Sequence, residues 1–154
     1  NDTAGAVVGS ILGAQLGFDK LPPKLREQVL TANKKELNID LETMAKIKIR
    51  LDGLSIKTFM GTWCEDSQRE IPRLYKILEG IGFELDNLEV IAVSHDKETP
   101  SGFEKDLDIE YVPTIIFYKD GKELGRFVEY AQNTLEKDIL SILSGTPYKH
   151  AYQE

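Results

Sequence analysis

The stretch that most constrains this chain is an apolar, β-prone run from Leu54 to Met60, which leads through a small-residue turn into a helix-patterned segment. Trp63 and Cys64 stand at the beginning of that segment, and Cys64 is the only cysteine in the 154 residues. The N-terminus of a helix has unpaired backbone N–H groups and the positive end of the helix dipole, which favour a thiolate. The sequence therefore raises the question whether the other elements build a reactive site around Cys64.

Length and composition indicate one globular domain. A chain of 154 residues can bury most of the surface that it exposes when unfolded. Its 41% hydrophobic and 29% charged residues are ordinary for such a domain. The net charge of −7 argues against a nucleic-acid or anionic-membrane surface. Because no apolar run approaches the roughly 18 residues that span a bilayer, we expect no membrane span.

A single cysteine excludes an internal disulfide, so the chain is not a disulfide-dense secreted scaffold. A cytoplasmic location stays open, as does a periplasmic or other extracytoplasmic one if a signal peptide was removed. Two histidines, His95 and His150, do not cluster with the cysteine, so we expect no metal site. His95 is expected to be solvated, with a titrating role near the thiol as the less favoured alternative. His150 is expected to be inert.

From residue 54 the hydrophobic pattern predicts the order β-α-β-α-β-β-α. In chain order the expected elements are strand 54–60, helix 65–79, strand 88–94, helix 99–107, strand 111–118, strand 123–127 and a last helix that ends at Gly145. Asn133 is the expected N-cap of that last helix, with Glu136 as the reciprocal member of a capping box. Strands joined by a helix form a parallel pair, whereas the turn at residues 119–121 predicts an antiparallel hairpin.

Before this order we expect an N-terminal extension, residues 1–38, that is partly helical, and we expect its first part, residues 1–19, to carry no chemistry. One helix is predicted to begin at Leu21-Pro22-Pro23, because proline suits the first helical turn. The domain proper, residues 39–145, is predicted to open with a helix capped by Asp40, whose buried face carries Leu41, Met44, Ala45 and Ile47. The alternative is a strand over 46–51 that turns at Asp52-Gly53. A polar tail with tyrosines, residues 146–154, follows.

Four sequence motifs follow one another in a specific order: Trp63-Cys64-Glu65-Asp66-Ser67, Pro72, Val112-Pro113-Thr114 and the hairpin at 117–121. Together with the element order they resemble the thioredoxin-like superfamily over about residues 40–145. The first motif stands where the family has Trp-Cys-x-x-Cys, Pro72 falls at its mid-helix proline, and the third motif matches its cis-proline segment. The resemblance implies an α/β fold, a three-layer α/β/α sandwich with a central mixed sheet of four to five strands flanked by helices.

The resemblance also implies that Cys64 is the residue that attacks a disulfide, while Ser67 replaces the cysteine that resolves the mixed disulfide. A hydroxyl cannot form the internal disulfide, but three residues away on a helix it can donate a hydrogen bond to the Cys64 thiolate. The family's neutral residues between the two cysteines are here Glu65 and Asp66, whose charges oppose a thiolate. Its buried carboxylate six residues before the attacking cysteine is here Thr58.

The expected substrate groove lies beside the thiol. Trp63 is predicted to be half exposed and to rim Cys64. If Pro113 is cis, as the resemblance implies, the backbone of Val112 lies next to Cys64 and can pair with an extended peptide or with glutathione. Thr114 belongs to the same segment. Glu65, Asp66 and Pro72 are expected to support the site.

The resulting hypothesis is a monothiol exchange protein that forms mixed disulfides with protein or glutathione disulfides. Its partners would be protein or peptide thiols and disulfides. No bound cofactor is expected beyond glutathione or another external thiol, and the oligomeric state stays open. One alternative is a redox-inactive, chaperone-like module that holds peptides between Trp63 and Val112-Pro113. Another is a dithiol reductase whose second cysteine was replaced by Ser67; the surroundings at Thr58 and at residues 68–70 favour a natural serine.

Overall fold

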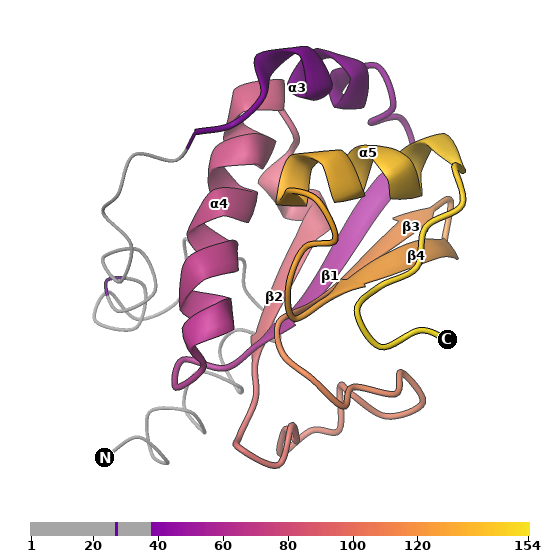
Figure 1. The fold of residues 1–154 in the computed structure, drawn as a ribbon. Coiled ribbons are helices and arrows are strands. Elements are labelled where there is room, and N and C mark those ends of the chain that lie inside the picture. Colours follow the sequence, from indigo (N-terminus) through magenta and orange to yellow (C-terminus); the bar gives the residue numbers. More distant parts are fainter. Residues whose placement is uncertain (1–26, 28–37) are drawn as a thin grey trace.

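The structure is a computed structural model that describes Glu27 and residues 38–154 (Figure 1). The predicted N-terminal extension, including the helix from Leu21, lies almost entirely outside the described residues. Its prediction is therefore untested.

A four-stranded mixed sheet forms the centre of the described domain. Its strands are β1 Leu54–Met60, β2 Leu88–Ala92, β3 Thr114–Lys119 and β4 Lys122–Val128, in the spatial order β2-β1-β3-β4. β1 and β2 are parallel, whereas the pairs β1–β3 and β3–β4 are antiparallel. The predicted α/β class and mixed sheet are therefore confirmed, and the hairpin turn lies where the sequence placed it.

The described helices pack against one face of this sheet. They are α3 Leu41–Lys48, α4 Glu65–Ile81 and α5 Leu135–Ser144, and a 3₁₀ turn, η2 Leu85–Asn87, precedes β2. Figure 1 shows α4 and α5 against one face of the sheet, with α3 lying across their ends. α4 passes through Gly80, and it ends where Gly82 adopts the left-handed conformation, with φ of 74°. The helix therefore runs two residues beyond the predicted end.

The two faces of the sheet bury separate hydrophobic clusters because successive side chains of a strand point to opposite faces. The larger cluster joins the helices to one face, and β1 contributes Leu54, Ile56 and Met60 to it. The smaller cluster on the other face consists of Phe59, Ile91, Val93, Val112 and Ile116. Trp63 and Cys64 are partly buried against this smaller cluster. The candidate site therefore lies in the loop between β1 and α4, next to the smaller cluster.

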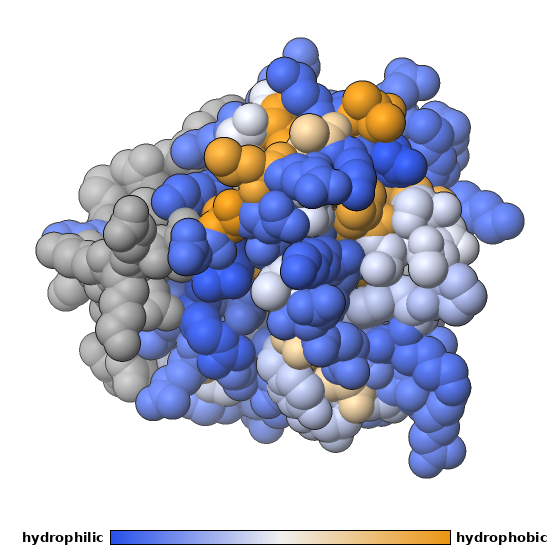
Figure 2. Space-filling view, turned by 45° about the horizontal axis from the view of Figure 1, so that its top comes forward, coloured by the Kyte–Doolittle hydropathy of each residue, from blue (hydrophilic) through white to orange (hydrophobic). Residues whose placement is uncertain are grey.

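The first described helix, α3, has the predicted cap but a different buried face. Asp40 is its N-cap and accepts a hydrogen bond from the Glu42 N–H, which decides against the alternative strand. Thr43 and Ile47 are buried, whereas Leu41 is 79% exposed. The prediction that Leu41 and Ala45 face the core is thus wrong. The helix packs instead through the side that carries Thr43, Met44 and Ile47. Figure 2 shows hydrophobic surface among charged residues over this end of the molecule.

The predicted helix at 99–107 is absent. The segment consists of turns in which Gly102 and Asp106 have positive φ angles of 70° and 62°, a conformation that a right-handed helix does not contain. The Thr99 hydroxyl accepts a hydrogen bond from the Phe103 N–H and donates one to Glu104. Such local side-chain bonds compete with helical ones, and the helical spacing of apolar residues was therefore misleading. The strand predicted to begin at residue 111 is β3, which begins at Thr114.

The N-cap of α5 is Thr134 and not Asn133. The Thr134 side chain accepts from the backbone N–H three residues later, so the helix starts one residue after the predicted position. The Glu136 side chain accepts a hydrogen bond from the Asp40 N–H at 3.2 Å and so serves the start of α3. The predicted capping box is therefore wrong, because a distant backbone group binds the carboxylate that would have closed it.

Candidate functional site

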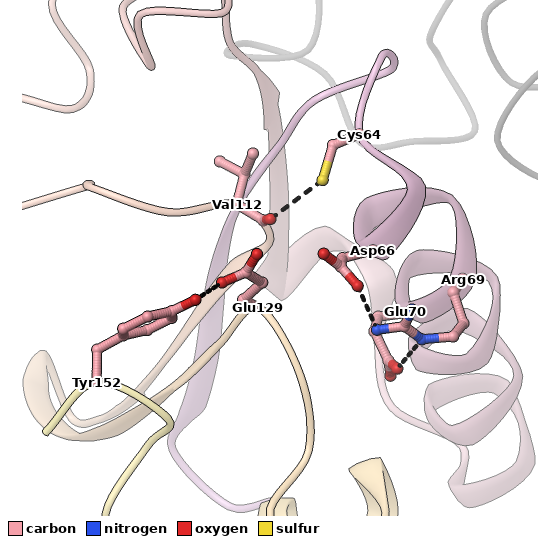
Figure 3. A network of polar contacts seen from close by, with 7 residues as sticks. All are labelled: Cys64, Asp66, Arg69, Glu70, Val112, Glu129 and Tyr152. Atoms are coloured by element: carbon pink, nitrogen blue, oxygen red, sulfur yellow. Dashed lines mark hydrogen bonds and ion pairs between the residues drawn. The ribbon is translucent and has the colours of Figure 1, made fainter.

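Cys64 is the N-cap residue of α4, in an extended backbone conformation with φ of −94° and ψ of 122°. Its N–H donates to the Gly61 carbonyl at 3.1 Å, and its carbonyl accepts from the Gln68 N–H at 3.0 Å. The side chain caps no helical N–H group and is half-buried. The turn therefore presents the thiol at the start of α4, as Figure 3 shows, while its backbone is held on both sides.

The thiol faces the segment that enters β3. Cys64 Sγ donates a hydrogen bond to the Val112 carbonyl oxygen at 3.2 Å, and the Val112–Pro113 peptide bond is cis. The Thr114 hydroxyl donates to the Tyr111 carbonyl at 2.6 Å and closes this turn. Three of the predicted binding residues, at positions 112 to 114, thus lie in one turn against the cysteine. Their side chains are buried, so the turn meets the thiol through its backbone, at the Val112 carbonyl.

Trp63 is held beside the thiol by three neighbours. Its indole N–H donates to the Val93 carbonyl at 3.1 Å. The ring lies so close to Gly61 that a Cβ there would come within 2.6 Å of it. His95 stacks on the ring, with centroids 4.3 Å apart and planes 20° from parallel. His95 is exposed, as expected of a solvated residue, but its stack on Trp63 places it at the site, where the less favoured alternative had put it.

Ser67 is fully buried one turn into α4. Its Oγ accepts a hydrogen bond from the Gly61 N–H at 3.1 Å and so supports the turn that carries the thiol. The described residues contain no hydrogen bond between Ser67 and Cys64, although the hydroxyl hydrogen is not used by this contact. Thr58, six residues before Cys64, is also fully buried, and its hydroxyl has no hydrogen-bond partner. Neither side chain can replace a second thiol or a buried carboxylate.

The acidic pair after the cysteine is compensated unequally. Asp66 accepts from Arg69 at 2.6 Å, and the same guanidinium binds Glu70 at 2.9 Å (Figure 3). Glu65 is exposed and has no ion pair among the described residues. Burial raises the pKa of Glu70, while its bond to Arg69 acts in the opposite direction. Uncompensated negative charge next to the sulfur therefore comes mainly from Glu65.

Pro72 lies inside α4 and is buried. It lacks the N–H that would bond to the Gln68 carbonyl, yet the helix continues to Ile81. The Gln68 side chain turns back and donates to the Thr62 carbonyl at 2.7 Å. Pro72 thus belongs to the scaffold behind the site, together with the turn at Thr62.

The tail adds residues that the sequence did not assign to the site. The Tyr152 ring stacks on Tyr111, with centroids 3.7 Å apart and planes 3° from parallel, and its hydroxyl donates to the Glu129 carboxylate. Further back, the Tyr148 hydroxyl donates to the buried Asp138 at 3.0 Å. The recurrence of tyrosine in the tail was the only signal in the sequence, because these contacts join residues far apart along the chain.

Within the part of the chain that the structure describes, no group of three or more His, Cys, Asp or Glu side chains could hold a metal ion. No helix of this part is both long and apolar enough to cross a bilayer.

A cysteine at the start of the helix that follows a central strand, opposite a cis X-Pro bond, defines a thioredoxin-like protein. The family model for thioredoxin matches residues 31–141, which is most of the sequence. The chain belongs to the thioredoxin family.

Individual relatives agree with this assignment. Thioredoxin Y, chloroplastic, of Oryza sativa subsp. japonica is 33% identical over 69 residues, which cover 45% of this chain but only 38% of that protein. A thioredoxin of Ictalurus punctatus is 28% identical over 95 residues, 62% of this chain and 85% of that protein. The solved structure of a Pseudomonas aeruginosa protein of unknown function covers 88% of this chain and 96% of that one, with 16% identity and a TM-score of 0.60. That likeness shows the fold alone.

Proposed function

We propose that this protein is a monothiol thiol–disulfide exchange protein in which Cys64 is the attacking residue. Membership of the thioredoxin family supports a function of the thiol–disulfide oxidoreductase type in general. The observation that carries the monothiol proposal is the half-exposed Cys64 thiol at the start of α4, with Ser67 buried at the position of the resolving thiol. The chain can begin an exchange, but it has no second thiol to complete it.

In the first step the Cys64 thiolate attacks one sulfur of a partner's disulfide. The new bond joins Cys64 to that sulfur, the partner's S–S bond breaks, and the other sulfur leaves as a thiolate that takes up a proton. In the second step an external thiolate, from glutathione or a protein, attacks the partner's sulfur in the mixed disulfide. Cys64 leaves as a thiolate, and the external thiol is now joined to the partner by a disulfide.

The contact between Cys64 and Val112 supports a role for the partner in converting the thiol to the reactive thiolate. The hydrogen bond to the Val112 carbonyl exists only while the sulfur carries its proton. An extended partner segment beside this turn would bring its own N–H groups to the same carbonyl. The partner would then replace the thiol as donor, which removes a contact that stabilises the protonated sulfur.

Ser67 supports the same proposal in two ways. Its Oγ holds the Gly61 N–H, which fixes the turn before the cysteine. Its hydroxyl hydrogen is left to donate to the Cys64 thiolate once that forms, because a hydroxyl can accept and donate at the same time.

The decisive experiment is incubation of the reduced protein with oxidised glutathione, or with an uncharged small disulfide, at neutral pH, followed by mass spectrometry. We expect one adduct on Cys64, its removal by added thiol, and no adduct on the Cys64→Ser variant. A wild-type Cys64 that stays unmodified by both reagents would contradict the proposal.

A redox-inactive binding module is the second candidate, favoured by the resting thiol, which serves as a hydrogen-bond donor to Val112. In that case peptides would bind equally well to the Cys64→Ala variant, and reductant would not release them. Loss of binding with either change would exclude this candidate.

A further inference from the structure

Three tyrosines and a glutamate form an exposed surface next to the cysteine. Tyr111, Tyr130 and Tyr152 are 37%, 46% and 42% exposed, although large hydrophobic side chains are mostly buried in this domain. Tyr152 stacks on Tyr111 and meets Tyr130 edge to face, with ring centroids 6.2 Å apart. The Tyr152 hydroxyl also binds the carboxylate of Glu129. We call this set the aromatic rim.

The aromatic rim is continuous with the site of exchange. Tyr111 directly precedes Val112, whose carbonyl accepts from Cys64. On the other side the Glu129 N–H donates to the Pro113 carbonyl at 2.8 Å. Figure 3 shows the Glu129 carboxylate between Tyr152 and the turn that holds Val112. A polypeptide bound across Cys64 and Val112 would therefore continue onto the aromatic rim.

The surroundings of the aromatic rim are acidic. A cleft of about 350 Å³ next to it is lined by Tyr111 and Tyr152 together with Asp108, Glu110, Arg126 and His150. Burial lowers the pKa of His150, which favours its neutral form. No ion pair within residues 38–154 neutralises Asp108 or Glu110.

The one arginine of this cleft is already engaged. Arg126 binds both carboxylate oxygens of Glu123, at 2.8 and 2.9 Å, and also donates to the Leu107 carbonyl at 2.6 Å. Glu129 forms no ion pair among the described residues either. Negative charge thus prevails beside three exposed aromatic rings.

We propose that the aromatic rim recognises a lysine- or arginine-containing segment of the partner protein, next to the partner's reactive cysteine. Ammonium and guanidinium groups bind both to aromatic faces and to carboxylates, which is the combination of groups present here. Anionic partners, glutathione among them, meet repulsion at the same place. This inference rests on the proposed exchange at Cys64 and specifies the class of its substrate.

The test compares two peptides of equal length, each carrying its cysteine as a mixed disulfide with the same small thiol. One has arginines and the other glutamates at the residues that flank the cysteine. We expect the arginine peptide to react with Cys64 at least about tenfold faster at low salt, because complementary charge raises the rate of encounter. The ratio should fall in about 0.5 M salt, where screening is strong.

Variants connect the preference to the aromatic rim. Glu129→Gln and Tyr152→Ala should each reduce the ratio of the two rates, whereas Tyr152→Phe, which keeps the stack, should reduce it less. Glu79→Gln is the matched control, since it removes one exposed carboxylate at the far end of α4 and should leave the ratio unchanged. Thermal unfolding of each variant shows that the fold persists.

Equal rates for the two peptides, or a ratio that Glu129→Gln does not change, would overturn this inference while leaving the proposed function intact. Failure of Cys64 to react even with an uncharged small disulfide would instead refute the proposed function. The inference is then tested by calorimetric binding of the same peptides with cysteine replaced by serine. A preference for arginine supports the aromatic rim, and its absence refutes it.

Discussion

A single substitution, S67C, should allow this protein to complete the exchange that it can only begin. Ser67 follows Cys64 by three residues in the first turn of α4 and is 0% exposed, whereas Cys64 is half-buried. The new thiol would be shielded from external disulfides but would lie within one helical turn of the sulfur that carries the partner. We therefore expect the variant to resolve its own mixed disulfide and to form an internal disulfide.

The expected gain in rate is large. Well-oriented neighbouring groups react as if present at about 10⁵ M or more. Even if imperfect orientation lowered this value to about 1 M, the new thiol would exceed an external thiol at about 1 mM by roughly a thousandfold. The cost falls on the Gly61 N–H, which loses its hydroxyl acceptor at 3.1 Å. A buried donor without a partner costs about 1–3 kcal/mol, so the reduced variant should be less stable than the wild type.

The assay counts the thiolate that each protein releases from an aromatic disulfide reagent with a coloured leaving group. Wild type should release one equivalent and keep the adduct, whereas S67C should release two without any added thiol. S67A controls for the lost hydroxyl, and the double variant C64S/S67C controls for direct attack by the new thiol. If S67C releases one equivalent and its adduct lasts as long as that of the wild type, position 67 is not aligned with Cys64 and the reasoning fails.

Three further substitutions test the surroundings of the site by urea unfolding. Because burial raises the pKa of Glu70, the wild type should lose stability as the pH rises from the usual carboxyl range toward that raised pKa; E70Q should lack this loss, and parallel pH profiles would contradict the reasoning. G61A should cost about 1–3 kcal/mol, since its Cβ would meet the Trp63 ring at 2.6 Å; an unchanged unfolding midpoint would show that the indole moves freely. Asp138 is buried and accepts three hydrogen bonds, so D138N should cost about 1.5–3 kcal/mol, and a loss below about 0.5 kcal/mol would exclude this role.

The sheet and the helix that carries the cysteine could be predicted from the sequence because their signals are local. The apolar run 54–60 became β1 without change, and the spacing of Ile71, Leu74, Tyr75 and Leu78 marked the buried face of α4. The order of four motifs was sufficient to indicate the family. Pattern and propensity suffice wherever an element buries one face against a core that all its neighbours share.

The errors have two physical causes: contacts between residues far apart along the chain, and local side-chain hydrogen bonds that compete with those of a helix. Glu136 had the spacing of a capping-box residue, but it binds the Asp40 N–H, 96 positions away. The segment 99–107 had helical spacing, but bonds of the Thr99 hydroxyl fold it into turns. At the site, the stack of His95 on Trp63 and that of Tyr152 on Tyr111 have no local signal. Such partners follow from the tertiary fold alone.

Trp63 and Cys64 are neighbours, and the sequence holds one residue of each kind. The protein therefore carries its own optical reporter and its own labelling point at the place where a partner is expected to bind. Every tryptophan signal from this chain originates at the stack with His95 and at the bond to Val93. Because the indole lies one residue from the thiol, its fluorescence should change when a partner is joined to Cys64, so formation and release of the mixed disulfide can be followed in real time without introducing a single foreign residue.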